Sequence, residues 1–267
     1  MKRLPALAAA LAAFASSAFA DEQYFGYLYP AEGMPKGAWE IYQWNTYRTG
    51  GIGMPEPAFN FATEFEYGLT EQLATSFYVD YAAFDGEGMN FQGLRNSWKY
   101  LFLTPAKNDF GLGIYIEPIW ARTTTSNGER EDKLALENKV LLQKNFLDDK
   151  LVWATNLVGE FEWEREPSDP WERKLEIEAS TGLAYRICDK ATVGIEALYQ
   201  SEYDHFSFNN QEKWMFGVGP TVHYRDGAWW GTLTWMPQLA GGPSVTGHRN
   251  LDEYGQHEIR LKLGVNF

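Results

Sequence analysis

Hydrophobic and polar residues alternate with a period of two along most of this chain. In residues 110–120 the face of even-numbered positions carries Phe110, Leu112, Ile114, Ile116, Pro118 and Trp120. Strict alternation of this length predicts a β-strand rather than a helix. Ten residue steps at ~3.3 Å each, tilted by ~40°, rise roughly 25 Å, which is the height of the lipid-facing band of an outer-membrane barrel.

The same alternation recurs and predicts twelve strands. They cover residues 39–48, 59–67, 73–81, 95–102, 110–120, 132–146, 151–164, 174–185, 193–200, 213–224, 229–235 and 258–267. The first alternates poorly, and either Glu40, Thr46 and Arg48 or Gln43 and Asn45 could face inward. Residues 132–146 could also form an amphipathic helix, because Leu, Glu and Lys favour helix, but their alternation and their place in the series favour a strand.

Connections between the predicted strands alternate between short and long. The short ones are 68–71, 104–109, 147–149, 188–190 and 225–227, and the long ones are 50–57, 85–90, 123–131, 165–171, 201–211 and 237–256. Short periplasmic turns and longer external loops are typical of outer-membrane barrels. We therefore expect an all-β fold, a transmembrane antiparallel up-and-down β-barrel of about twelve strands, with both termini on the periplasmic side.

Outward-facing aromatic residues gather at the strand ends. Near the long loops are Trp120, Trp163, Tyr199, Trp214 and Trp235, and near the short turns are Tyr67, Phe102, Phe146, Trp153, Tyr185, Tyr224, Trp229 and Phe267. Two such groups predict the aromatic girdles of a membrane barrel, one at each interface. On this interpretation most of the aromatic content lies in the girdles.

Composition narrows the class by exclusion. The 267 residues include 17 Phe, 15 Tyr and 11 Trp, which argues against disorder, and the formal net charge of −13 argues against a nucleic-acid partner. One cysteine allows neither an internal disulfide nor a cysteine-based zinc site. Mean hydropathy is −0.41, as expected where apolar residues alternate with polar ones.

The first twenty residues have the features of a secretory signal peptide. Lys2 and Arg3 precede an Ala- and Leu-rich run too short to span a bilayer, and Ala18 and Ala20 fit a cleavage site after Ala20. Cleavage there takes the formal net charge from −13 to −15. We expect a signal peptide over 1–20, a periplasmic segment or partial plug over 21–36, and the barrel over 37–267.

The chain ends on an outward aromatic residue of its last alternating strand, Phe267. This ending resembles the signature by which the outer-membrane assembly machinery recognises its barrel substrates. The resemblance implies that the machinery is a partner of the C-terminal strand.

Several short motifs resemble an uncharacterised family of outer-membrane barrels of Gram-negative bacteria. They are Pro35-Lys36-Gly37 with Trp39-Glu40, Glu66-Tyr67-Gly68-Leu69-Thr70-Glu71-Gln72-Leu73, Trp98-Lys99-Tyr100, Glu117-Pro118, Leu142-Gln143-Lys144-Asn145-Phe146 and Pro220-Thr221-Val222-His223-Tyr224. The opening motif is also similar to outer-membrane transporters linked to aromatic-compound catabolism. The resemblance implies a fold and a location, and it carries over no functional residue.

Charged residues on the predicted inward faces are the candidates for function. Glu160, Glu162, Glu176 and Glu178 lie on adjacent strands towards the external end and predict a cation-attracting ring or a calcium site. Lys99, Glu117 and Lys139 lie near mid-height on three neighbouring strands and predict a charge ladder. The plainer alternative is that these charges only keep the interior wet.

These observations favour a narrow passive pore for small solutes, since twelve strands lie between a filled eight-stranded barrel and an open sixteen-stranded one. A closed structural or adhesive barrel and an enzyme acting on lipid or lipopolysaccharide are the alternatives. For the enzyme, the close Ser/His pairs are His205 with Ser207 and Ser244 with His248, and no motif supports a nucleophile. We expect no catalytic site, no cofactor and no bound metal, and we expect membrane lipid and lipopolysaccharide as partners.

Overall fold

The computed structural model describes residues 23–53, 58–84, 88–124, 129–244 and 247–267. These residues form twelve strands that close into one antiparallel barrel, in which each strand pairs with its neighbours in sequence and β1 pairs with β12. The strands are β1 (Trp39–Thr49), β2 (Ala58–Gly68), β3 (Leu73–Phe84), β4 (Asn90–Leu103), β5 (Gly111–Thr123), β6 (Arg130–Phe146), β7 (Leu151–Arg165), β8 (Glu172–Cys188), β9 (Ala191–Asp204), β10 (Gln211–Asp226), β11 (Trp229–Gly242) and β12 (His257–Asn266). The predicted fold class and strand count are confirmed, and β6 is a strand rather than a helix.

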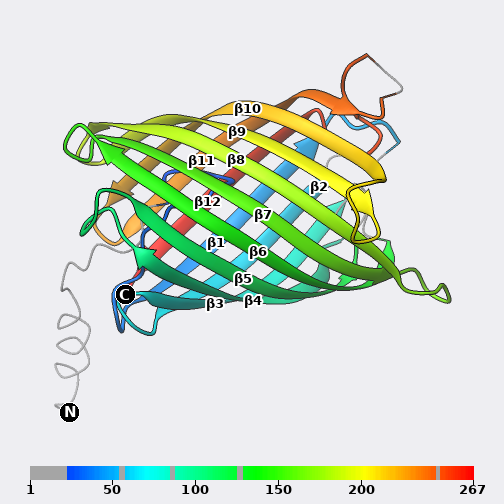
Figure 1. The fold of residues 1–267 in the computed structure, drawn as a ribbon, viewed down its shortest axis with the longest axis horizontal. Helices are drawn as coiled ribbons and strands as arrows, with labels where there is room; N and C mark the ends of the chain where they lie inside the picture. Colours follow the sequence, from blue (N-terminus) through cyan, green and yellow to red (C-terminus); the bar gives the residue numbers. More distant parts are fainter. Residues whose placement is uncertain (1–22, 54–57, 85–87, 125–128, 245–246) are drawn as a thin grey trace, which may run out of the picture.

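The two ends of the barrel differ. Figure 1 shows the C-terminus and the five short turns at one end, which we call the terminus end, and the long connections at the other, which we call the loop end. The strands run steeply tilted between the two ends, as barrel closure requires.

The faces of the strands divide as the alternation predicts. Outward side chains such as Ile114, Leu134, Ile195 and Leu263 are 36–50% exposed, so an apolar surface surrounds the barrel. An apolar outer surface of this kind is typical of barrels that span a membrane. Among the described residues, no helix is long and apolar enough to cross a bilayer.

The facing of the first strand, left open by its sequence, is settled by burial. Glu40, Tyr42, Trp44 and Thr46 are all buried inside the barrel, with at most 9% of each exposed. Bulky aromatic side chains therefore share the inner face of β1 with polar ones, which is why a simple apolar–polar pattern did not appear there.

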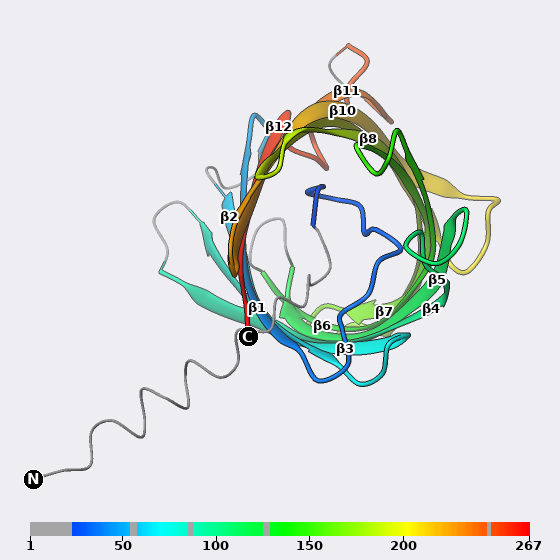
Figure 2. The ribbon, with the colours of Figure 1, turned by 90° about the vertical axis from the view of Figure 1, so that its left-hand side faces the viewer.

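Residues 23–35 lie inside the barrel, and we call them the inner segment. The blue trace in Figure 2 enters at the terminus end and bends within the ring of strands before it continues into β1. The predicted signal peptide and cleavage site over 1–20 lie outside the described residues.

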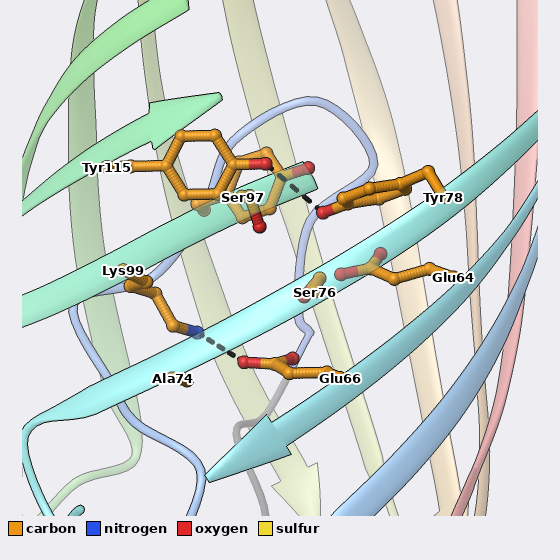
Figure 3. Close-up of a pocket in the computed structure, with 9 residues that line it drawn as sticks. Glu64, Glu66, Ala74, Ser76, Tyr78, Ser97, Lys99 and Tyr115 are labelled. Carbon is orange, nitrogen blue, oxygen red and sulfur yellow. Dashed lines mark hydrogen bonds and ion pairs between the residues drawn. The ribbon is translucent and has the colours of Figure 1, made fainter. Parts of the chain in front are cut away.

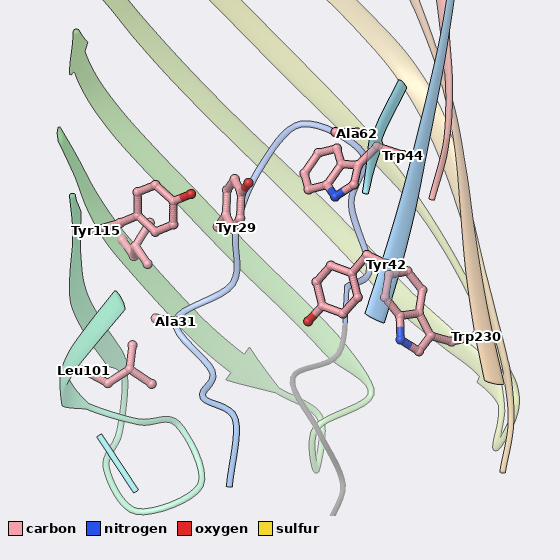
Figure 4. Packing of buried hydrophobic residues seen from close by; sticks show 9 residues of the cluster. Tyr29, Ala31, Tyr42, Trp44, Ala62, Leu101, Tyr115 and Trp230 are labelled. Carbon is pink, nitrogen blue, oxygen red and sulfur yellow. The ribbon is translucent and has the colours of Figure 1, made fainter. Parts of the chain in front are cut away.

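A buried aromatic cluster lies in the lumen, where none was expected. Tyr29 of the inner segment stands between Tyr115 of β5 and Trp44 of β1, and Tyr42 packs against Trp230 of β11 (Figure 4). The aromatic content is therefore divided between the outer surface and the lumen, where the inner face of β1 and the inner segment contribute bulky side chains of their own.

Candidate functional site: the barrel lumen

The inner segment forms a loop that rises into the barrel and returns. Its start, Gln23, and its later residue Met34 both lie near the terminus end, the latter in contact with Gly68 and Ala74. Between them Tyr27 reaches β12 near the loop end, where its hydroxyl donates to Glu258 Oε1 at 2.9 Å. The segment is buried, with Phe25 and Leu28 fully enclosed. Its backbone therefore lies in the terminus half of the lumen, and the Tyr27 side chain extends from it towards the loop end.

Glu196 of β9 holds the turn of the inner segment. Its carboxylate accepts from the backbone N–H groups of Gly26, at 2.7 Å, and Tyr27, at 2.9 Å. It also accepts from the hydroxyl of Thr234 on β11 at 2.7 Å. Glu196 is 2% exposed, so an ionised carboxylate at this depth depends on these three donors for its stability.

The remaining backbone of the segment is bonded to the wall in the same way. The side-chain amide of Asn156 on β7 accepts from Tyr29 N–H at 2.6 Å and donates to Tyr29 C=O at 2.8 Å. Both backbone polar groups of Tyr29 are therefore bonded to this one side chain. Thr221 of β10 donates to the carbonyl of Tyr24 at 3.1 Å, and Thr232 of β11 donates to that of Gln23. The wall thus supplies the partners that a strand neighbour would otherwise provide.

Cations from the wall pack against the aromatic side chains of the segment. The Arg260 guanidinium lies 4.0 Å from the centre of the Tyr27 ring, and its Nη1 donates to Gly26 C=O at 3.3 Å. Lys139 Nζ lies 4.8 Å from the Tyr29 ring. Lys262, which is fully buried, donates to Gln23 Oε1 at 3.2 Å. The segment is therefore fitted to this lumen by polar, cation–π and apolar contacts together.

A small polar cavity lies beside the segment, between β2 and β5 (Figure 3). The Lys99 ammonium forms an ion pair with the Glu66 carboxylate at 3.3 Å, and the Tyr78 and Tyr115 hydroxyl oxygens are 3.1 Å apart. The cavity volume is about 10 Å³, which is about the space that one water molecule needs. The cavity fits water better than an organic ligand.

The four glutamates of the predicted acidic cluster lie on the β7–β8 wall towards the loop end. Glu160 lies directly opposite Glu176 in the strand register, and Glu178 follows two residues along β8. Lys133 of β6 pairs with Glu162 at 2.6 Å and with Glu160 at 3.3 Å. The structure therefore brings the four together on one wall, with a lysine at one edge.

Glu202 of β9 extends this wall and was not predicted. It pairs with Lys213 at 3.0 Å and with Lys174 at 3.4 Å, and Lys174 also contacts Glu164. We call Glu160, Glu162, Glu164, Glu176, Glu178 and Glu202 the acidic wall. The predicted loop 201–211 contains Glu202, although Glu202 continues the inward alternation of Glu196 and Gln200, and this alternation is the signal that identifies it.

The predicted ladder of Lys99, Glu117 and Lys139 does not form. In the register it is Tyr115 that lies opposite both lysines, while Glu117 lies opposite Glu137. Glu117 pairs instead with Arg95 at 2.9 Å, and Lys139 with Glu137 at 2.8 Å. Residues at the same distance from one end of the barrel are not paired with each other in the sheet. Because the strands are tilted to the barrel axis, the hydrogen-bonded neighbour on the next strand lies nearer to one end or the other.

The Ser/His pairs of the external loops are not joined in the described part of the chain. Ser207 Oγ accepts from Asn209 N–H at 3.4 Å, and the His205 ring contacts Asp204 at 2.7 Å. Ser244 donates to the carbonyl of Arg249. Among the described residues, no group of three or more His, Cys, Asp or Glu side chains is arranged to hold a metal ion.

Phe267 completes the closure of the barrel. Its N–H donates to Trp39 C=O at 2.8 Å and its C=O accepts from Trp39 N–H at 3.3 Å, while its side chain is 63% exposed. An exposed terminal aromatic residue is available to lipid or to another protein.

The chain is similar to one protein family in sequence and to a solved porin in fold. Residues 17–267 match a family model described as a family of unknown function, DUF6662. Among solved structures, the NanC porin aligns over 85% of this chain and 98% of its own, with a TM-score of 0.55 and 12% identity. The KdgM porin in complex with disordered oligogalacturonate aligns over the same shares at a TM-score of 0.46 and 12% identity. No curated protein matches the chain.

Proposed function

The chain belongs to the DUF6662 family, and we propose that it is a narrow passive outer-membrane pore for small solutes, restricted by its inner segment. The observation that carries this proposal is the lining of the lumen. A fully packed, dry barrel interior leaves no charged side chain open to water, whereas here Lys133, Lys174 and Lys213 face the loop half of the lumen with 23–25% of each side chain exposed.

Barrel size supports a narrow pore. Side chains just fill an eight-stranded barrel, and sixteen strands leave an aqueous channel, so twelve strands leave room for a small passage or for one chain segment. The porin NanC, to which this fold is similar, has the same general architecture. The inner segment takes up that room in the terminus half.

The inner segment is the element that would set conductance. It crosses the lumen without joining the sheet, and its backbone is bonded to side chains such as Glu196 and Asn156 rather than to a strand. Such contacts can break without opening the barrel wall. Displacement of the segment would open the terminus half of the lumen.

A cation preference follows from the acidic wall. Its six carboxylates face Lys133, Lys174 and Lys213, so the carboxylates exceed the lysines by three. A ring of excess negative charge in a confined passage attracts cations and repels anions. The similarity of the opening motif to transporters of aromatic compounds makes small aromatic solutes the first to test.

Planar-bilayer recording of the chain purified from outer membranes tests the pore. We expect small steps from the full chain and larger, steadier steps from a variant that lacks residues 23–34. Correct assembly of each protein is checked first by its shift in gel mobility on heating. No steps from either protein would refute the pore and favour a closed structural barrel.

Selectivity is tested separately, by the reversal potential in a salt gradient. Glu176→Gln with Glu178→Gln should reduce the preference for cations, because it removes two of the six carboxylates of the acidic wall. The matched control is Asp148→Asn with Asp149→Asn, which removes the same charge from an exposed turn at the terminus end. An unchanged reversal potential in the glutamate variant would refute the cation preference and leave the pore standing. Liposome swelling with aromatic and sugar solutes then identifies the solute class.

A further inference from the structure

Four arginines lie side by side on the outside of the barrel at the loop end. They are Arg122 of β5, Arg130 of β6, Arg165 of β7 and Arg173 of β8, and we call them the arginine rim. Each occupies an outward position at the loop end of its strand, and all four are exposed. Adjacent strands lie about 4.8 Å apart, so the rim extends over about 14 Å of the barrel circumference.

The arginine rim is local to this part of the barrel. At the same level, the outward positions of the other eight strands include Tyr47, Phe59, Tyr81 and Leu239, and among the described residues none of these positions carries Lys or Arg. The rim is therefore a distinct patch rather than one part of a continuous basic belt.

Most of the positive charge on the rim is not neutralised by the protein. Arg165 pairs with Asp132 at 3.1 Å. Within the part of the chain that the structure describes, the guanidinium groups of Arg122, Arg130 and Arg173 make no ion pair and no hydrogen bond. The acidic residues next to the arginines in β6 and β7, Glu131 and Glu164, face the lumen and not the rim.

An apolar surface lies directly on the membrane side of the rim. Trp120, Leu134 and Trp163 are outward neighbours of the arginines and are 37–48% exposed. The loop between β9 and β10, which lies outside the wall in Figure 2, adds Phe206, whose ring packs edge-on against Phe161 at 5.3 Å and Trp163 at 5.2 Å. Unpaired cations stand here immediately above a lipid-facing aromatic surface.

We propose that the arginine rim binds the phosphate groups of lipopolysaccharide, with the acyl chains of the same molecule lying against Trp120, Trp163 and Phe206. Guanidinium groups bind phosphate oxygens through paired N–H donors, and they do so more specifically than ammonium groups. The predicted orientation, with the long loops external, places the loop end at the outer leaflet, whose lipid carries phosphate at the boundary between sugar and acyl chain. The site does not depend on the pore, because none of its residues faces the lumen.

Binding of lipid A to the full chain in zwitterionic detergent, followed by native mass spectrometry, tests this site. The variant Arg122→Gln, Arg130→Gln and Arg173→Gln leaves the Arg165–Asp132 pair intact. Each arginine near an anionic lipid surface contributes about fivefold in affinity, so we expect the triple variant to bind bisphosphorylated lipid A about 100-fold more weakly. The control Lys107→Gln, Lys144→Gln and Lys150→Gln removes the same charge from exposed positions at the terminus end and should bind like the parent.

Two further ligands separate the possible sources of binding. Dephosphorylated lipid A should bind the parent chain weakly, and phosphatidylglycerol should bind less tightly than bisphosphorylated lipid A. Equal binding of lipid A by the triple variant and the lysine control would overturn the proposal. Phosphatidylglycerol binding as tight as that of lipid A would overturn it too, because the rim would then be a general anionic-lipid surface. Arg122→Gln and Arg173→Gln alone, each expected to weaken binding about fivefold, replace the triple variant if it fails to assemble.

Discussion

Glu196 gives the sharpest test of the inner segment, because one side chain bonds both the segment and the wall. The change Glu196→Gln keeps the size of the side chain and removes its charge. The amide oxygen can still accept from one or two of the three donors, Gly26 N–H, Tyr27 N–H and Thr234 Oγ1. The amide NH₂ then faces a buried donor and leaves it without an acceptor.

The cost follows from the number and kind of bonds. Each bond that loses a charged acceptor weakens by about 1 kcal/mol, and one buried donor without a partner costs about 1–3 kcal/mol. Together these give about 3 kcal/mol, which multiplies the population with a displaced segment by about 150.

Thiol labelling measures that population directly. Leu28 is fully enclosed in the segment, and Leu28→Cys in a Cys188→Ser background places one thiol there. The rate of its reaction with a membrane-impermeant maleimide should rise by about 150-fold in Glu196→Gln. Bilayer conductance should become more frequent in the same variant.

Glu162→Gln is the matched control. Glu162 is 3% exposed and is paired with Lys133, and it does not touch the segment in the described structure. Its labelling rate should match that of the parent. A rate in Glu196→Gln within about threefold of this control would refute the assignment of Glu196 as the residue that holds the segment.

Two further predictions concern stability and assembly. Gly264→Ala should lower the urea midpoint of the folded barrel by the equivalent of about 2 kcal/mol, because a Cβ there would lie 2.2 Å from the enclosed Trp230 ring. Gly159→Ala is the control and should change the midpoint little, because the nearest atom to its Cβ is 3.8 Å away. Equal midpoints for the two variants would contradict this prediction. Phe267→Ala should reduce the heat-modifiable barrel found in outer-membrane fractions by severalfold, and Phe146→Ala, another exposed outward aromatic residue at the terminus end, should not; equal amounts would remove the assembly role of Phe267.

The strands could be predicted from the sequence because the outward face of each strand and its inward face lie in different surroundings. Lipid outside and polar groups inside impose alternation directly on segments such as 110–120, so β5 was identified from its pattern. Loop lengths correctly separated the two ends of the barrel, with short turns at one end and long connections at the other.

The interior of the lumen could not be predicted in the same way. The inner segment makes no ladder and has no period, so residues such as Phe25 and Tyr29 gave no signal of burial. Which residues lie opposite each other on adjacent strands depends on the shear of the barrel, and alternation does not encode shear. This explains why Tyr115 rather than Glu117 lies opposite Lys99 and Lys139. Alternation predicts the acidic cluster of Glu160, Glu162, Glu176 and Glu178 on the inner faces of two neighbouring strands. It does not predict Glu202, because the predicted ninth strand ends at residue 200, whereas β9 continues to Asp204.

The position of the inner segment also has a consequence for the order of folding. Its residues leave the ribosome before any strand does, yet their partners Asn156, Glu196 and Arg260 lie 127 to 234 positions further along the chain. Contacts of such sequence separation are slow to form, and these require β7, β9 and β12 to be in place. Among the described residues, those synthesised first are therefore those that reach their native contacts last, and a late assembly intermediate should be a complete barrel with an empty lumen.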